Sequence, residues 1–252
     1  MSRMTEETRK RQPFRRLAAD QRREEIINAA INLFGSRSEE EVSIDEIAAA
    51  AGTSRSSLYR HFEDKGELYL ASMRTLSTEL VARLDAVAFG GSPSQQLADR
   101  ITVYFDFLEE YGVGYADLLQ MSMHVPSQEA IKLASEVRDQ VFQLTYETLE
   151  IAEPPAALRI GLQAWMAGLE WTAMEWLRDR REPRSQVEVL MQVQFASMLV
   201  GVAAYDPDVA IKLDWILEQE PPGSPAALFV RSLLDAVTLR MIGNCTRMLG
   251  PG

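Results

Sequence analysis

The segment from residue 42 to residue 69, VSIDEIAAAAGTSRSSLYRHFEDKGELY, constrains the fold of this chain more than any other stretch. Ser43 is followed three positions later by Glu46, the spacing of a helix capping box, and Gly52 follows the apolar repeat where that helix should end. Ser54 then supplies the N-cap of a second short helix, which begins with hydroxyl and basic side chains. Two short helices joined by a glycine turn are typical of a helix-turn-helix, whose second helix enters the major groove of DNA.

Helical periodicity extends over the rest of the chain. Apolar residues at three- and four-residue spacing follow Asp20, which can cap a first helix, and Asp64 opens a longer helix that ends before Gly90. Later helices are expected over residues 95–111, 115–123, 127–150, 156–181, 185–204, 207–219 and 226–241. No segment has the two-residue alternation of a half-buried strand. The sequence therefore predicts an all-α protein, in which a three-helix domain with a helix-turn-helix precedes a larger helical domain.

The charge of the chain is unevenly distributed. Residues 1–75 hold 13 basic and 13 acidic residues, so the whole net charge of −11 lies in residues 76–252. Within the neutral part, residues 1–23 hold eight arginine and lysine residues against three acidic ones, which makes the N-terminus a basic arm. Such an arm either contacts nucleic acid or is a solvated tail, and the sequence leaves both readings open.

Residue types that active sites need are scarce. Cys245 is the only cysteine, which excludes an intrachain disulfide and favours the reducing cytoplasm. His61 and His124 lie far apart and no Cys/His cluster has zinc spacing, so we expect no metal and no cofactor. No catalytic triad and no Gly-rich phosphate loop points to an enzyme, although an all-helical enzyme or ligand carrier stays an alternative.

Nothing in the sequence points to a membrane. No apolar run approaches the roughly 18–20 residues that a membrane helix needs. Residues 1–17 contain arginines but lack the apolar core of a signal peptide. We therefore expect a soluble, cytoplasmic protein with no membrane partner.

Residues 20–75 resemble the N-terminal domain of the TetR (tetracycline repressor) family of transcriptional regulators. The string IA-x-x-AG-x-S-x-x-x-LY-x-HF-x-x-K-x-x-L of that family is complete here, from Ile47 to Leu68. The rest of the chain resembles the family by architecture only. Two positions depart from the usual glycine: Ser38 after the first helix, and Ser56 early in the recognition helix, where the added hydroxyl should alter operator preference.

The resemblance implies a homodimeric regulator, with repression as the expected activity, that binds a near-palindromic operator in double-stranded DNA. It also implies release from that operator by a small-molecule effector, and a constitutive DNA-binding dimer without an effector is the closer alternative. The expected divisions are a basic N-terminal arm at 1–19, a helix-turn-helix DNA-binding domain at 20–70, a helical ligand-binding and dimerisation domain at 71–205, and an additional C-terminal helical extension at 206–252.

Side chains of the helix-turn-helix are the candidate DNA contacts. Arg55, at the start of the recognition helix, can reach the O6 and N7 atoms of a guanine with its fork of donors. By resemblance Tyr59 and His61 contact phosphates, and Lys65 adds its charge to the positive end of the next helix. Alternatively, Tyr59 and His61 only pack the small domain and Lys65 is a solvated charge. The complete predicted set is Ser43, Thr53, Ser54, Arg55, Ser56, Ser57, Tyr59, Arg60, His61 and Lys65.

Aromatic and methionine side chains of the larger domain are the candidate effector pocket. They could line a cavity in the core or simply fill it. No arginine or lysine lies between Arg100 and Lys132, so a neutral or cationic apolar compound is favoured over a large anion. The predicted lining is Tyr104, Phe107, Tyr111, Tyr115, Met121, Met123, His124, Phe142, Trp165 and Met166.

Small residues on one side of the helix predicted over residues 156–181 would let another helix approach closely. By resemblance this helix and the next pair with their twofold mates as a four-helix bundle, whereas ordinary packing within the chain is the alternative. The predicted dimer interface is Leu158, Gly161, Ala164, Gly168, Leu169 and Trp176.

Overall fold

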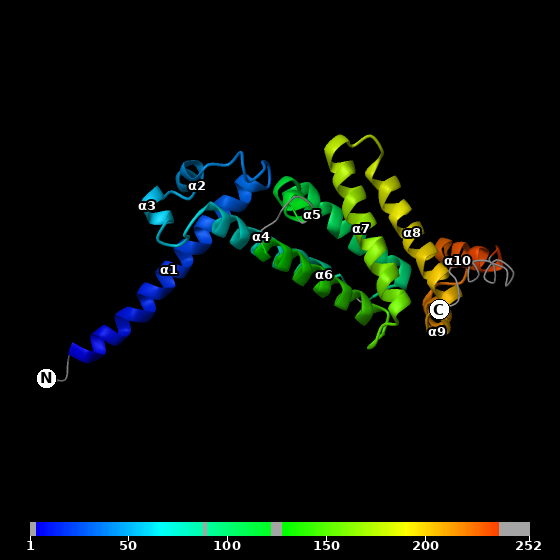
Figure 1. The fold of residues 1–252 in the computed structure, drawn as a ribbon. Helices are drawn as coiled ribbons and strands as arrows, with labels where there is room; N and C mark the ends of the chain where they lie inside the picture. Colours follow the sequence, from blue (N-terminus) through cyan, green and yellow to red (C-terminus); the bar gives the residue numbers. More distant parts are fainter. Residues whose placement is uncertain (1–3, 88–89, 122–127, 237–252) are drawn as a thin grey trace. The chain divides into compact units, whose positions relative to one another are not determined.

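The computed structural model describes the backbone of residues 4–87, 90–121 and 128–236 and the side chains within 19–87, 90–112 and 128–236. Over the described residues every regular element is an α-helix (Figure 1), and the all-α prediction is confirmed. The chain divides into two compact units. The N-terminal unit comprises residues 1–79 and 110–135, and the C-terminal unit comprises residues 80–109 and 136–252.

Ten helices are described, in the order α1 (Met4–Phe34), α2 (Ile44–Ala50), α3 (Arg55–Leu58), α4 (Lys65–Asp85), α5 (Pro93–Met121), α6 (Gln128–Thr148), α7 (Ala156–Asp179), α8 (Arg184–Tyr205), α9 (Pro207–Gln219) and α10 (Pro225–Ala236). Helices α6, α7, α8 and α9 begin and end within two residues of the prediction, whereas the predicted end of α10 at residue 241 lies outside the described residues. The first helix differs, because it starts at Met4 rather than after Asp20. Residues 4–19 hold seven Glu, Arg and Lys residues of favourable helix propensity, and the helix continues toward the N-terminus through Pro13 despite the unfavourable propensity of that residue.

Helix α5 also differs from the prediction, which placed a break between residues 111 and 115. The structure continues one helix through Gly112 and Gly114 to Met121. A glycine inside a helix costs only about 1 kcal/mol relative to alanine, so two glycines reduce helix stability without ending the helix.

The core of the N-terminal unit explains why its short helices fold. Phe34 of α1 meets Tyr69 of α4 edge to face, with the ring centroids 5.1 Å apart. Leu58 of α3 and Phe62 of the following turn are at most 1% exposed, so both anchor the recognition element from beneath. The same packing leaves the opposite side of α3 in solvent.

The core of the C-terminal unit includes the last two helices. Val209, Leu213 and Leu217 of α9 and Val230 of α10 are buried in one hydrophobic cluster with residues of α6, α7 and α8. Residues 206–236, the described part of the predicted C-terminal helical extension, therefore contribute to the hydrophobic core of this unit.

Helix α8 is long and apolar enough to cross a membrane by length and composition, contrary to the expectation that no stretch comes close. Its charged residues, Arg184 and Glu188, both lie in the first two turns, and residues 189–205 carry no charge. Met191, Phe195 and Leu199 of this helix are buried within the C-terminal unit, whereas Leu190 and Tyr205 are exposed.

Candidate nucleic-acid interface

The turn between α2 and α3 has the geometry that its sequence predicts. Gly52 has a φ of +60°, in the left-handed region that favours glycine. The Thr53 N–H donates to the Ala48 oxygen at 2.9 Å and the Gly52 N–H to the Ala49 oxygen at 3.1 Å, which is the bonding pattern of a Schellman helix end. This turn fixes the direction in which α3 leaves α2 (Figure 1).

The predicted capping box at the start of α2 is present. The Glu46 N–H donates to Ser43 Oγ at 3.2 Å, while the backbone N–H and the hydroxyl of Ser43 donate to Glu46 Oε2 at 2.9 and 2.7 Å. Arg37 Nη1 lies 2.9 Å from Glu46 Oε1. The backbone N–H of Ser43, then the Arg37 side chain and the Ser43 hydroxyl, lower the pKa of Glu46 to about 2.

Ser43, one of the predicted DNA contacts, is engaged at the start of α2 in this structure. Its N–H and its hydroxyl hydrogen are already directed to Glu46, so in this structure the residue offers DNA no donor. Its observed contribution is to hold the first turn of α2.

The start of α3 is also capped, and its side chains are in solvent. Ser54 Oγ accepts a hydrogen bond from the Ser57 N–H at 3.2 Å and lies 3.0 Å from Ser56 Oγ. The Arg55 side chain is 59% exposed. Its Nη1 lies 3.1 Å from Asp45 Oδ2, and its guanidinium carbon lies 5.7 Å from the centre of the Tyr59 ring.

The other predicted contacts divide by exposure. Tyr59 is 42% exposed, so it does not simply pack the small domain. The remaining predicted side chains are exposed at Ser56 and Arg60 and half-buried at Thr53, Ser57 and His61. The structure therefore brings Ser54, Ser56, Arg55 and Tyr59 together on the outer side of α3.

Lys65 is neither a solvated charge nor only a phosphate contact. Its Nζ donates to the Glu39 backbone oxygen at 2.7 Å and to the Val42 backbone oxygen at 3.4 Å, in a half-buried site. The ammonium thus joins the start of α4 to the loop before α2. It has three donor hydrogens, so one remains for a phosphate.

The described residues of the predicted effector pocket lie in two separate units. Phe142, Trp165 and Met166 belong to the hydrophobic cluster of the C-terminal unit, where Trp165 Nε1 donates to the Met191 oxygen at 3.1 Å. Tyr104 and Phe107 are buried in the same unit, and Tyr111 belongs to the N-terminal unit. The side chains of Tyr115, Met121, Met123 and His124 lie outside the described residues.

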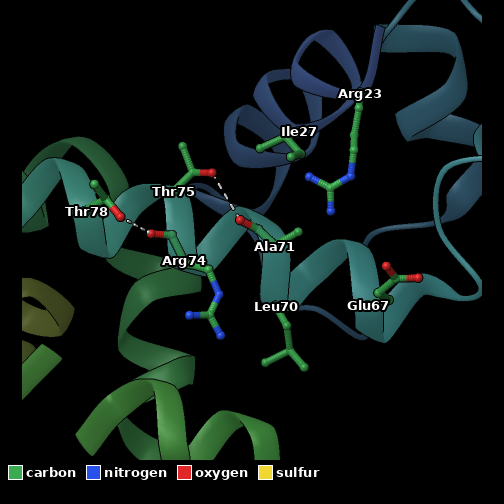
Figure 2. Close-up of a pocket in the computed structure, with 8 residues that line it drawn as sticks. All are labelled: Arg23, Ile27, Glu67, Leu70, Ala71, Arg74, Thr75 and Thr78. Atoms are coloured by element: carbon green, nitrogen blue, oxygen red, sulfur yellow. Dashed lines mark hydrogen bonds between the residues drawn. The ribbon is translucent and has the colours of Figure 1, made fainter. Parts of the chain in front are cut away.

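A groove is described elsewhere, between α1 and α4 of the N-terminal unit (Figure 2). It has a volume of about 430 Å³ and is lined by Arg23, Ile27, Glu67, Leu70, Ala71, Arg74, Thr75 and Thr78. The two threonine hydroxyls donate to backbone oxygens of their own helix, at 3.1 and 2.9 Å. None of the residues predicted for the effector pocket lines it.

The predicted dimer interface is partly wrong. Leu158, Leu169 and Trp176 are at most 8% exposed because they pack inside their own chain, and Trp176 Nε1 donates to the Glu182 oxygen at 2.9 Å. A Cβ added to Gly161 would lie 2.8 Å from Met198 Sδ, so the close approach at this glycine is to α8 of the same chain. Ala164 and Gly168 are exposed.

The sequence analysis did not predict an exposed apolar stripe on α7 and α8. Ile160 and Trp171 of α7 are 66% and 55% exposed, and Leu190 and Tyr205 of α8 are 49% and 63% exposed. One side of α7 holds, at spacings of three or four residues, Ile160, Ala164, Gly168 and Trp171. Trp171 lies on the same side as Gly168, so the sequence contained evidence for this apolar stripe.

Two family models match the chain. Residues 26–72 match "Bacterial regulatory proteins, tetR family", and residues 93–198 match "Tetracyclin repressor-like, C-terminal domain". Helices α9 and α10 lie beyond both matches.

Related sequences and solved structures indicate the same family as the two family models. The chain is 32% identical to the HTH-type transcriptional activator FasR of Mycolicibacterium smegmatis over 186 residues, which cover 72% of this chain and 84% of FasR. A tetR-family transcriptional regulator from Streptomyces coelicolor superposes with a TM-score of 0.79 at 34% identity, over 86% of this chain and 97% of that chain. FadR from Bacillus subtilis, solved in complex with stearoyl-CoA, shares the fold with a TM-score of 0.54 at 16% identity, over 69% of this chain and 96% of FadR. The chain is therefore a member of the TetR family of DNA-binding transcriptional regulators.

Proposed function

We propose that this protein is a homodimeric regulator that reads a near-palindromic operator with α3, represses from it in the cytoplasm and leaves it when a small apolar effector binds. The observation that carries the proposal is the exposed Arg55 at the start of a capped α3. A guanidinium there can donate two parallel hydrogen bonds to a guanine, while Ser56, Tyr59 and Arg60 beside it can meet phosphates.

The test of base reading begins with selection of operators from random double-stranded DNA. Arg55→Ala should lower discrimination at one base pair of each half-site by about 5- to 150-fold. Arg60→Ala is the matched control, because it removes an equally exposed positive charge and should weaken binding to all sequences alike. An Arg55→Ala protein with unchanged base preference would show that another side chain reads the operator.

Dimerisation is proposed through the exposed stripe of α7 and α8. Ile160, Trp171, Leu190 and Tyr205 would otherwise expose a large apolar surface to water. Ala164, Gly168 and Gly201 present little bulk on the same helices, which suits the close contact of a helix bundle. Two copies of α3 must lie about 34 Å apart to enter successive major grooves, so reading a near-palindromic operator requires a dimer.

Repression is the proposed activity, and activation is the second candidate because FasR is named a transcriptional activator. The two differ in one measurement. With the selected operator placed upstream of a reporter, deletion of the regulator should raise expression if it represses and lower expression if it activates.

The effector is proposed to be a neutral or cationic apolar compound bound among the aromatic side chains of the C-terminal unit. This class follows from the burial of Phe107 and Phe142, from the partial burial of Trp165 and from the absence of Arg and Lys between Arg100 and Lys132. The ligand of FadR is not transferred, since an identity of 16% supports the shared fold alone. A constitutive regulator would bind its operator equally with and without every compound.

The effector test should use mild substitutions. The ring of Trp165 meets that of Phe195 edge to face, with the ring centroids 4.8 Å apart. Trp165→Ala would therefore cost about 3–5 kcal/mol in the free energy of unfolding, whether or not Trp165 contacts the effector. Trp165→Phe keeps most of the packing. A compound that raises the melting temperature and releases the operator from the wild type, but less from Trp165→Phe, would place the pocket at this residue.

The arm at residues 1–19 is proposed to strengthen DNA binding through its positive charge. Deletion of residues 1–16 should then lower operator affinity most at low salt, because its charges act by counterion release. Unchanged affinity at every salt concentration would leave the arm without a role in binding.

A further inference from the structure

An ion pair joins the first turns of the two helices of the helix-turn-helix. Arg55 is the first residue of α3 and Asp45 is the second residue of α2, and Nη1 of Arg55 lies 3.1 Å from Oδ2 of Asp45. Both side chains are largely exposed, at 59% and 68%. An ion pair between side chains this exposed to solvent contributes little to folding stability, so stability does not account for its presence.

The same guanidinium is held from a second side. The ring of Tyr59, one helical turn after Arg55, lies 5.7 Å from the guanidinium carbon. A hydrogen bond with Tyr59 and the charge of Asp45 both raise the pKa of Arg55. The carboxylate of Asp45 and the ring of Tyr59, which directly follows α3, therefore hold the Arg55 side chain in one direction in the absence of DNA.

This arrangement leaves donors available. A guanidinium has five N–H donors; the pair with Asp45 uses one on Nη1 and the hydrogen bond with Tyr59 uses another, so three remain, enough for the O6 and N7 atoms of a guanine. An arginine that is already held loses less rotamer freedom when it forms those bonds than one that moves freely in solvent.

We propose that Asp45 is a positioning residue that makes Arg55 selective for its base, an inference that rests on the base-reading role of Arg55 proposed above. Asp45 has a second effect of opposite sign on affinity. Its carboxylate repels the phosphates of any DNA, so it lowers binding to all sequences while it sharpens the choice among them. A solvated surface acid would have the first effect without the second.

The test compares Asp45→Asn with Glu40→Gln. Both changes remove one negative charge from an exposed side chain of the same unit, but only Asp45 pairs with Arg55. Affinities are measured for the selected operator and for the operator altered at the base pair that Arg55→Ala identifies. Asp45→Asn should raise affinity for the altered operator and reduce the ratio of the two affinities by about 1.5- to 5-fold per half-site, the range that the coupling of one exposed ion pair allows.

Three further results decide the outcome. Glu40→Gln should raise both affinities together and leave their ratio unchanged, and Asp45→Glu, which keeps the charge, should recover part of the ratio. If Asp45→Asn behaves like Glu40→Gln while Arg55→Ala still loses discrimination, the positioning role is refuted and the proposed function stands. If Arg55→Ala itself loses no discrimination, both are refuted.

Discussion

The ammonium of Lys65 lies 2.7 Å from the backbone oxygen of Glu39, across 26 residues of sequence. A second bond, to the Val42 oxygen at 3.4 Å, makes this side chain a tie between the start of α4 and the loop that precedes α2. Lys65 is therefore part of the structure of the helix-turn-helix, and we expect its loss to weaken DNA binding through that structure as well as through its charge.

The tie predicts a loss of stability that a surface lysine would not show. Lys65→Met keeps the aliphatic stem but removes the ammonium from both carbonyls, which leaves the Glu39 backbone oxygen with the longer bond from the Val42 N–H at 3.4 Å and should cost about 1–3 kcal/mol in the free energy of unfolding. Arg60→Met is the control, because it removes an exposed charge and should leave stability unchanged. Equal melting temperatures for the two variants would reduce Lys65 to a surface charge.

The capping box predicts an acid-sensitive α2. The pKa of Glu46 is lowered from 4.5 to about 2 in the folded protein, so its bonds stabilise the fold fully above pH 4.5 and lose that effect as the pH falls through 2. A carboxyl titration followed by NMR should show this pKa. Arg37→Met should raise it while leaving it below 4.5, since Ser43 still donates to the carboxylate. A Glu46 that titrates at its ordinary value would mean that the box opens in solution.

Contacts between nearby residues were predictable, and contacts between distant residues were not. The box of Ser43 and Glu46 and the cap at Ser54 each involve residues three apart, so local spacing contains the whole signal. The bond from Lys65 to Glu39 depends on the path of a loop 26 residues earlier, which no local pattern describes.

Because local spacing does not describe contacts between distant residues, it also misplaced Gly161, which was predicted to lie at the dimer interface. A helical wheel places Gly161 and Gly168 on one side of α7, but it cannot tell whether the neighbouring helix belongs to the same chain. In the structure Gly161 faces Met198 and Val202 of the same chain, whereas an added Cβ at Gly168 meets no heavy atom within 4 Å.

Substitutions of these two glycines should have different effects, one on folding stability and the other on dimerisation. Gly161→Ala would place a Cβ 3.0 Å from Val202 Cγ2, a stiff side chain, so it should destabilise the fold by about 1–3 kcal/mol without preventing association. Gly168→Arg should leave each chain folded and produce monomers in sedimentation experiments, with loss of operator binding. A Gly168→Arg protein that remains a dimer would move the proposed interface away from this stretch of α7.

The final prediction concerns Glu220, a carboxylate at the end of α9 that is only 7% exposed. It accepts hydrogen bonds from the backbone N–H of Ser94 at 2.6 Å and from its hydroxyl at 2.8 Å, at the first turn of α5 and 126 residues away in sequence. Negative charge at the start of a helix is favourable, and Glu220 also satisfies a donor that the helix itself cannot. Glu220→Ala should therefore cost about 1–3 kcal/mol and expose the start of α5 to hydrogen exchange. Glu218→Ala, an exposed neighbour on α9, is the control and should change neither. Truncation after Tyr205 should be more severe, because it removes Val209, Leu213 and Leu217 from the core of the C-terminal unit. A truncated chain that keeps its melting temperature would show that α9 and α10 are a dispensable addition to this unit.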